Sequence, residues 1–146
     1  MNPAQPKVSD AVLHGDALPS ETIVCDLTTL VVYAAATWDF HRYHYDAAFV
    51  KTIDMPAPFV DGQMIGALLA SRLMRWGGPD AFVRKLAYRQ RTTVFVDDTI
   101  ILGGKVAART VENGSKLVTF NLSVQKPDGT FIVRDGTATV DLGSAP

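Results

Sequence analysis

The sequence predicts an α+β fold with an antiparallel sheet. One long apolar helix is expected over residues 62–76, and four stretches of β patterning follow at about 83–96, 99–111, 116–126 and 130–141. In the third of these stretches apolar and polar residues alternate, which is typical of a strand with one buried face. An earlier strand would bring the sheet to five. One long buried helix beside such a sheet suggests that the sheet curls around the helix.

The first third of the chain is punctuated by prolines and cap residues. Residues 1–18 show little periodicity and are expected to form an arm on the surface. A short strand is predicted over Thr22–Leu27. Thr28 or Thr29 can then cap a helix that runs through Thr37, because a threonine oxygen accepts from the unpaired amides of a first helical turn.

The middle and the end of the chain follow the same reasoning. Asp46 is expected to cap a short helix that reaches Ile53, before two prolines stop it. The 62–76 helix is apolar nearly all round, so it should be enclosed. Turns are expected at Asn113-Gly114 and at 127–129, since glycine accepts a positive φ and proline presets the first turn residue.

Length and composition fit one domain over residues 1–146 with no linker. A net charge of −1 gives no electrostatic case for a nucleic-acid partner. Cys25 is the only cysteine and cannot form an internal disulfide, and the chain opens with no secretory pattern, so a cytoplasmic location is expected. Charged residues or glycines interrupt each apolar stretch before the ~20 residues that a membrane span requires, so a soluble protein is expected.

Residues 38–46 concentrate acid–base groups between aromatic residues. Asp39 and His44 lie five positions apart, which suits a loop leaving a helix better than one helical turn. Such a loop can direct a carboxylate and an imidazole at one water molecule, as general acid–base catalysis requires.

The same stretch resembles the signature of the MaoC-like hydratases and dehydratases, with Asp39, His44 and Asp46 at its acidic and histidine positions. His41 and Arg42 stand where many family members carry Asn-Pro. This version is similar to a branch that includes mesaconyl-CoA hydratase-like and mitochondrial-type hydroxyacyl dehydratases.

Two further matches follow in the family's order. Residues 58–62 resemble its Pro-x-Val-His-Gly, with Asp61 in place of the histidine and Gly62 at the glycine. Residues 88–99 resemble its "F-x-x-P-V-F-x-G-D-T" strand and turn, with Thr93 and Asp97 replacing the proline and the glycine. Together the matches span roughly residues 15–108.

The resemblance implies a hot-dog fold, in which a five-stranded antiparallel sheet wraps around one central helix. In the family two such domains pair edge to edge, so a homodimer or a hot-dog heteromer is expected. The implied activity is that of an enoyl-CoA hydratase or a 3-hydroxyacyl dehydratase. Asp39 and His44 would hold the water whose oxygen attacks C3 and whose proton reaches C2, and the Gly62 amide would bind the thioester oxyanion.

Several neighbouring residues are candidates for substrate binding. His41 is expected to form hydrogen bonds behind the site, and Arg42 to bind acidic substrate groups or an ion-pair partner. Asp61 is expected to face a partner such as Arg42 or to turn away, because an inward anion would oppose the enolate. Arg89 and Arg91, together with Arg84 and Lys85, form a basic cluster. This cluster would suit the phosphates of coenzyme A or phosphopantetheine, or is a solvated strand face.

The chemistry needs no redox cofactor, and the sequence supports no metal site. Coenzyme A or phosphopantetheine would serve as the acyl carrier. Three alternatives remain open, namely a polyketide-tailoring dehydratase or cyclase, a catalytically silent hot-dog subunit of a hetero-oligomeric hydratase, and a thioesterase. The thioesterase is disfavoured because residues 63–77 contain no acidic residue.

Overall fold

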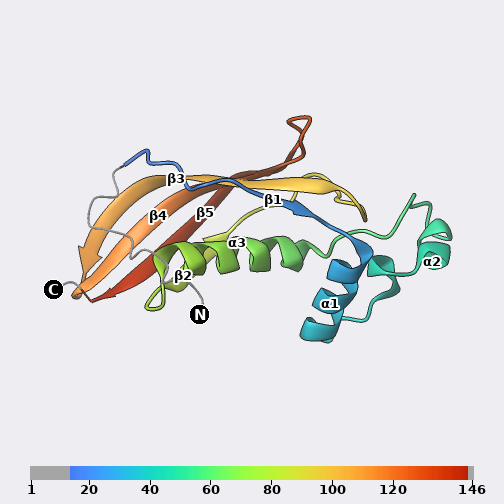
Figure 1. The fold of residues 1–146 in the computed structure, drawn as a ribbon, viewed down its shortest axis with the longest axis horizontal. Coiled ribbons are helices and arrows are strands. Elements are labelled where there is room, and N and C mark those ends of the chain that lie inside the picture. Colours follow the sequence, from blue (N-terminus) through green and yellow to red (C-terminus); the bar gives the residue numbers. More distant parts are fainter. Residues whose placement is uncertain (1–13, 145–146) are drawn as a thin grey trace, which may run out of the picture.

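One antiparallel sheet of five strands dominates the computed structural model, which describes residues 14–144 (Figure 1). Its strand order is β1-β3-β4-β5-β2. The strands are β1 (Glu21–Val24), β2 (Phe82–Ala87), β3 (Thr99–Glu112), β4 (Ser115–Gln125) and β5 (Phe131–Ser144). The three long strands form two hairpins, and positive φ angles at Asn113, Gly114 and Gly129 confirm the predicted turns.

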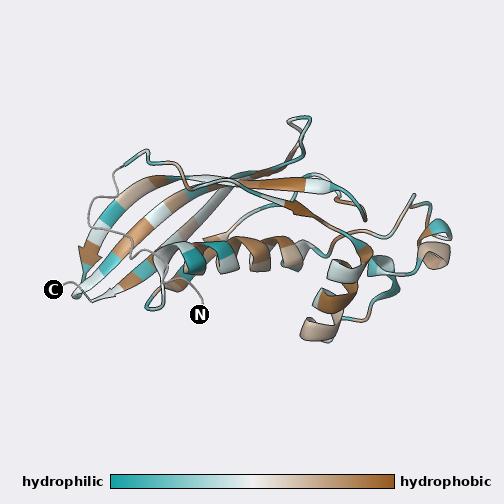
Figure 2. Cartoon of the chain, in the orientation of Figure 1, coloured by the Kyte–Doolittle hydropathy of each residue, from teal (hydrophilic) through white to brown (hydrophobic). Residues whose placement is uncertain are grey.

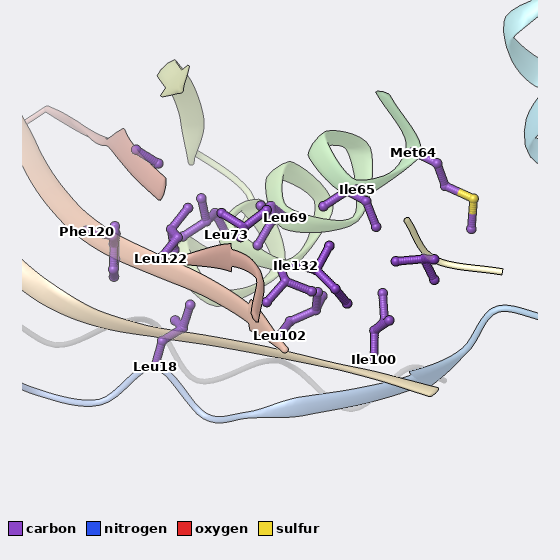
Figure 3. Packing of buried hydrophobic residues seen from close by; sticks show 14 of the residues in the cluster. Leu18, Met64, Ile65, Leu69, Leu73, Ile100, Leu102, Phe120, Leu122 and Ile132 are labelled. Atoms are coloured by element: carbon purple, nitrogen blue, oxygen red, sulfur yellow. The ribbon is translucent and has the colours of Figure 1, made fainter. Parts of the chain in front are cut away.

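The long helix α3 (Gly62–Gly77) lies against the concave side of this sheet (Figure 1). Its inward side chains point at strand residues in the core (Figure 3). The buried residues shown there include Met64, Ile65, Leu69 and Leu73 from α3, and Ile100, Leu102, Phe120, Leu122 and Ile132 from the strands. The predicted hot-dog architecture is confirmed.

The helix α3 matches its predicted start and ends one residue later. Asp61 caps it by accepting a hydrogen bond from the Gln63 amide at 2.9 Å. Gly78 adopts a φ of 91° just beyond its end, a conformation that suits glycine. The expectation that α3 is enclosed is wrong, because one face of it is open to solvent; the exposed residues on this face are Gln63, Ala67, Ser71 and Met74. Figure 2 shows that polar residues on α3 gather toward its C-terminal end.

The segment before α3 contains helices α1 (Leu27–Thr37) and α2 (Ala47–Lys51) and a short 3₁₀ helix, η1 (Arg42–His44). Asp26, not a threonine, caps α1 by accepting from the Thr29 amide at 2.7 Å. The first strand therefore ends at Val24, earlier than predicted. Asp46 caps α2 as predicted, although α2 ends before Ile53.

The predicted strand over 83–96 is correct only in its first half. Beyond Ala87 the chain leaves the sheet and pairs instead with the loop that precedes α3. Val60 donates its amide to Val94 at 2.8 Å, and Val96 donates to Pro58 at 2.8 Å. Asp98 accepts from the Phe95 amide and stabilises the turn that leads into β3. This pairing brings two of the three sequence motifs together beside the start of α3.

The predicted arm over 1–18 lies outside the described residues up to residue 13. Its last part is tied to β3, since Gly15 donates to Val106 at 2.8 Å and Leu18 donates to Gly104 at 2.9 Å. Residues 14–17 are exposed, as expected for a surface arm, whereas Leu18 is buried in the core. Among the described residues, no helix is both long and apolar enough to cross a membrane.

Cys25 lies buried between β1 and α1. Burial raises the pKa of its thiol to about 11, and the nearby carboxylates of Asp98 and Asp26 act in the same direction. A thiol with so high a pKa is a poor nucleophile, so Cys25 has a packing role.

Candidate active site

Three titratable side chains meet at the start of α3. Asp39 follows α1, His44 ends η1, and Asp61 is the N-cap of α3. One oxygen or nitrogen atom of each lies within 4.8 Å of those of the other two. The sequence motifs thus converge in space, and Asp39 and His44 approach each other as their spacing predicted.

The end of α1 positions Asp39. Trp38 adopts a left-handed conformation with a φ of 61°, which stops the helix, and the Asp39 amide donates to the Ala34 carbonyl at 3.0 Å. The Asp39 carboxylate then accepts from the His41 amide at 3.2 Å through Oδ1. This turn fixes the carboxylate while Oδ2 stays available.

His44 is 9% exposed, and one short contact sets its orientation. Its Nδ1 lies 2.7 Å from the Phe59 carbonyl oxygen, which can only accept, so Nδ1 carries the hydrogen. In the neutral ring Nε2 therefore has a lone pair and can accept a proton. Phe59 also donates its amide to the Tyr43 carbonyl at 3.1 Å, and the Phe59 and Tyr43 rings stack. The residues that precede and follow α2 in the sequence therefore meet beside His44.

The separations among Asp39, His44 and Asp61 suit a shared water molecule. Two hydrogen bonds of about 2.8 Å to one water, at a roughly tetrahedral angle, span about 4.6 Å. Oxygen and nitrogen ligands of a tetrahedral zinc ion lie only about 3.4 Å apart. Separations within 4.8 Å allow one water molecule to bridge these groups, and the absence of a metal requirement stays a prediction.

Tyr33 is a member of the site that the sequence interpretation missed. It lines a small enclosed cavity together with His44 and Asp61. Burial, and next the negative charges of Asp61 and its neighbours, raise the pKa of Tyr33 above its ordinary value, so its hydroxyl keeps its hydrogen at neutral pH. The Tyr33 hydroxyl is thus a hydrogen-bond donor close to the acceptor groups of Asp39, His44 and Asp61. The only sequence signal was a single tyrosine within the predicted helix.

Tyr88 fixes the start of α3 from the other side. Its hydroxyl donates to the Gly62 carbonyl at 2.9 Å, and its ring packs on Gly66 so closely that a methyl group there would lie 2.4 Å from the hydroxyl oxygen. The pKa of Tyr88 is also raised, mainly by burial. Within the described part of the chain no acceptor pairs with the Gly62 amide, as expected for the first amide of a helix.

Removing the Tyr88 hydroxyl is expected to loosen this end of α3. We expect Tyr88→Phe to lower the free energy of unfolding by about 1 kcal/mol, because a partly buried hydrogen bond is lost while the ring still packs. Urea denaturation of both proteins measures the difference. An unchanged unfolding midpoint would show that the hydroxyl does not anchor Gly62.

The comparisons with known proteins agree with this geometry. No family profile matches the chain. A curated relative, the 3-oxo-4,17-pregnadiene-20-carboxyl-CoA hydratase beta subunit of Mycobacterium tuberculosis, is 28% identical over 128 residues, which cover 88% of this chain and 93% of the relative. The structure of an (R)-hydratase from A. caviae matches with a TM-score of 0.80 and 21% identity over 92% of this chain and 100% of that one. A MaoC-like dehydratase from Rhodospirillum rubrum matches with a TM-score of 0.74 and 17% identity, over 92% and 95% of the two chains.

These matches cover nearly all of the described fold and carry the same architecture. The chain has the hot-dog fold of these proteins. The assignment of Asp39, His44, Asp46 and Gly62 to the MaoC-like signature stays a prediction from the sequence.

The expected orientation of Asp61, which replaces the MaoC-like histidine, is wrong. It was expected to pair with Arg42 or turn away, but it faces Asp39 and His44. Arg42 instead donates to Asp46 at 2.7 Å and lies over the Phe49 ring, so it is held away from Asp61. The cause is local, because Asp61 must cap α3 and Asp46 lies one helical turn from Arg42.

The other residues predicted to bind substrate are not part of the cluster formed by Asp39, His44 and Asp61. His41 is exposed and stacks on Tyr43 with ring centres 3.7 Å apart. Arg89 and Arg91 are exposed on the segment after β2, and Arg91 lies 3.5 Å from Asp135. Neither lines the cavity around His44. Their roles toward a carrier phosphate stay a prediction.

Proposed function

We propose that this protein is a hydro-lyase that adds water to the C2–C3 double bond of a 2-enoyl thioester, or removes it from a 3-hydroxyacyl thioester. The observation that carries the proposal is the convergence of Asp39, His44 and Asp61, whose acceptor atoms lie within 4.8 Å of one another beside the free Gly62 amide. The hydratase and dehydratase names of the MaoC-like relatives support the same reaction class.

The proposed reaction uses each group for one task. Asp39 and His44 hold the water and accept a proton from it as its oxygen forms a bond to C3. The electron pair of the double bond moves toward the thioester, and the oxyanion that develops accepts a hydrogen bond from the Gly62 amide at the positive end of α3. The proton that Asp39 and His44 took from the water is then delivered to C2, which completes the addition, and dehydration follows the same steps in reverse.

Asp61 changes the hydrogen-bond balance of this site. One water has two hydrogens, so it can donate to only two of the three acceptors at a time. We propose that the Tyr33 hydroxyl donates to the remaining carboxylate, which would lessen the repulsion between Asp61 and the oxyanion. The sensitivity of the Tyr33 pKa to both Asp61 and Asp39 supports this arrangement.

We further propose that the chain acts as a single domain within a homodimer or a hot-dog heteromer. The strands β1 and β2 lie at the sheet edges, where backbone groups remain open to pairing. Val24 on β1 and Phe82 on β2 are 53% and 65% exposed. The relative's designation as a beta subunit supports a partner subunit. Coenzyme A or phosphopantetheine is proposed as the acyl carrier, with no redox cofactor.

One alternative also has a specific observation in its favour, namely a catalytically silent subunit that shapes a partner's acyl pocket. The inward Asp61 carboxylate beside the oxyanion amide and the beta-subunit relative both point to it. The presence of both Asp39 and His44 argues against it, because a silent subunit has no need for this pair.

The deciding experiment is a mass-spectrometric assay of the purified chain on a panel of enoyl-CoA and 3-hydroxyacyl-CoA thioesters. We expect at least one thioester to gain or lose one water, and we expect Asp39→Asn to abolish that change. Failure to convert any thioester on the panel would contradict a self-sufficient enzyme and favour the silent subunit.

A further inference from the structure

A second cavity lies at the other end of α3, beside the segment that leads into β1. Its volume is about 390 Å³, and Leu18, Glu21, Arg72, Arg75 and Trp76 are among the residues that line it. Ten residues of helix separate Arg72 from Gly62, which is about 15 Å along the axis. The cavity is therefore separate from the three acceptors, and a ligand bound there would take no part in the proposed reaction.

Arg72 is 5% exposed and poorly supplied with acceptors. Its Nη2 donates to the Leu18 carbonyl over a long 3.3 Å, and its Nε lies 3.9 Å from the Glu21 carboxylate, beyond hydrogen-bond reach. Its Nη1 is buried and has no hydrogen-bond partner. A guanidinium offers five N–H donors, and leaving buried donors unpaired is costly, so this arrangement calls for a further acceptor.

The charges around the cavity also favour a further acceptor for Arg72. Arg75 holds Glu21 closely, with Nη2 at 2.8 Å and 2.6 Å from the two carboxylate oxygens. Among the described residues that line the cavity, Glu21 is the only acidic one, so two guanidinium groups face a single carboxylate. Burial lowers the pKa of Arg72 most; the charge of Glu21 has the next largest effect and raises it, and the charge of Arg75 lowers it. A ligand with negative charge would relieve this imbalance.

We propose that this cavity is a binding site for a small anion, a carboxylate or a phosphate, held between Arg72 and Arg75. Among the described residues the Arg72 guanidinium makes one hydrogen bond, the long one to Leu18, so its other donors are left for the ligand. Arg75 is half exposed and contributes the outer guanidinium. The Trp76 ring, fixed edge-on against Phe120, and the Leu18 side chain give the cavity apolar walls suited to the body of an organic acid.

The test measures anion binding to the full chain by calorimetry and by thermal melting. Inorganic phosphate and acetate are titrated separately, with chloride at the same ionic strength as the reference. We expect at least one of the two anions to bind and to raise the melting temperature in proportion to its occupancy. A response to phosphate alone identifies phosphate as the ligand chemistry, whereas a response to acetate includes carboxylates. Equal melting curves in all three salts would overturn the proposal.

Two variants at the rim make the test specific. Arg75→Gln is expected to weaken anion binding at least about tenfold, because it removes a charged donor and frees Glu21 to pair with Arg72. Glu21→Gln is expected to strengthen binding, because it removes the competing carboxylate. Arg134→Gln, the same change of charge at an exposed arginine on β5, should leave binding unaltered. If Arg134→Gln weakens binding as much as Arg75→Gln does, the effect is one of general surface charge and the proposal fails.

Arg72→Met tests the buried arginine itself. A cation with an unpaired donor in the interior is often replaceable by an apolar residue without loss of stability. We expect this variant to melt no lower than the parent in anion-free buffer and to lose its response to phosphate and acetate. A retained response would overturn the proposal. If Arg72→Met does not fold, the opposite shifts expected for Arg75→Gln and Glu21→Gln still decide the outcome.

Discussion

Asp39→Asn and His44→Ala are each expected to lower kcat at least about a hundredfold on any thioester that the parent protein converts. Asparagine keeps the size of Asp39 and its Oδ1 bond to the His41 amide, so that variant removes basicity and little else. His44→Ala also leaves the Phe59 carbonyl without its donor, and its melting temperature should fall as well. The comparison of the two variants separates chemistry from packing.

The losses of kcat in the two single variants should not be additive in the double variant. If Asp39 and His44 hold one water together, removing either disables the pair, and the double variant should be little slower than the slower single variant. His41→Ala is the matched control, since His41 is exposed and stacks on Tyr43. Its kcat should fall much less. Rates are measured on an enoyl-CoA by following its absorbance, and a near-normal rate for Asp39→Asn would refute the mechanism.

Gly62→Ala is expected to reduce kcat more than it reduces stability. A methyl group at this position would crowd the approach of the thioester to the free amide, and loss of one oxyanion donor costs about 3–4 kcal/mol of transition-state stabilisation. The fold should tolerate the change, because the added carbon meets only the flexible end of Gln90, at 3.2 Å. The measurements are kcat and the melting temperature.

Gly66→Ala, one turn further along α3, serves as the opposite control. There the methyl group would collide with the Tyr88 ring and hydroxyl, so we expect this variant to lose stability first. Equal activity of the parent and a bulkier Gly62→Val variant would remove the Gly62 amide from the mechanism.

Local signals in the sequence were sufficient for much of the fold. Asp61 before the helix and Gly78 after it bracket α3 at its predicted start and near its predicted end. The hairpin turns followed from glycine at positions of positive φ. The error after Ala87 has a clear cause. Residues 88–98 carry β-forming side chains, but their backbone partners are in the loop before α3, a long-range pairing that periodicity does not reveal.

The sequence likewise predicted only part of the candidate site. The spacing of Asp39 and His44 placed both in one loop, and the structure brings them together. Asp61 was noticed but given the wrong orientation, because sequence spacing does not show that Arg42 pairs with Asp46. The contributions of Tyr33 and Tyr88 depend on contacts across the start of α3, which the sequence does not show.

Phe59 contacts Tyr43 and His44, so the segment that contains α2 is a loop whose two ends lie together. The chain departs after His44 and returns at Phe59 to the same place, while α2 itself projects from the end of the molecule away from the sheet (Figure 1). Because the entropy of closing a loop grows only slowly with its length, residues can be inserted or exchanged around α2 at small cost. Residues added at the exposed turn after α2 should therefore cost little stability, because the contacts of Phe59 hold both ends of this loop in place.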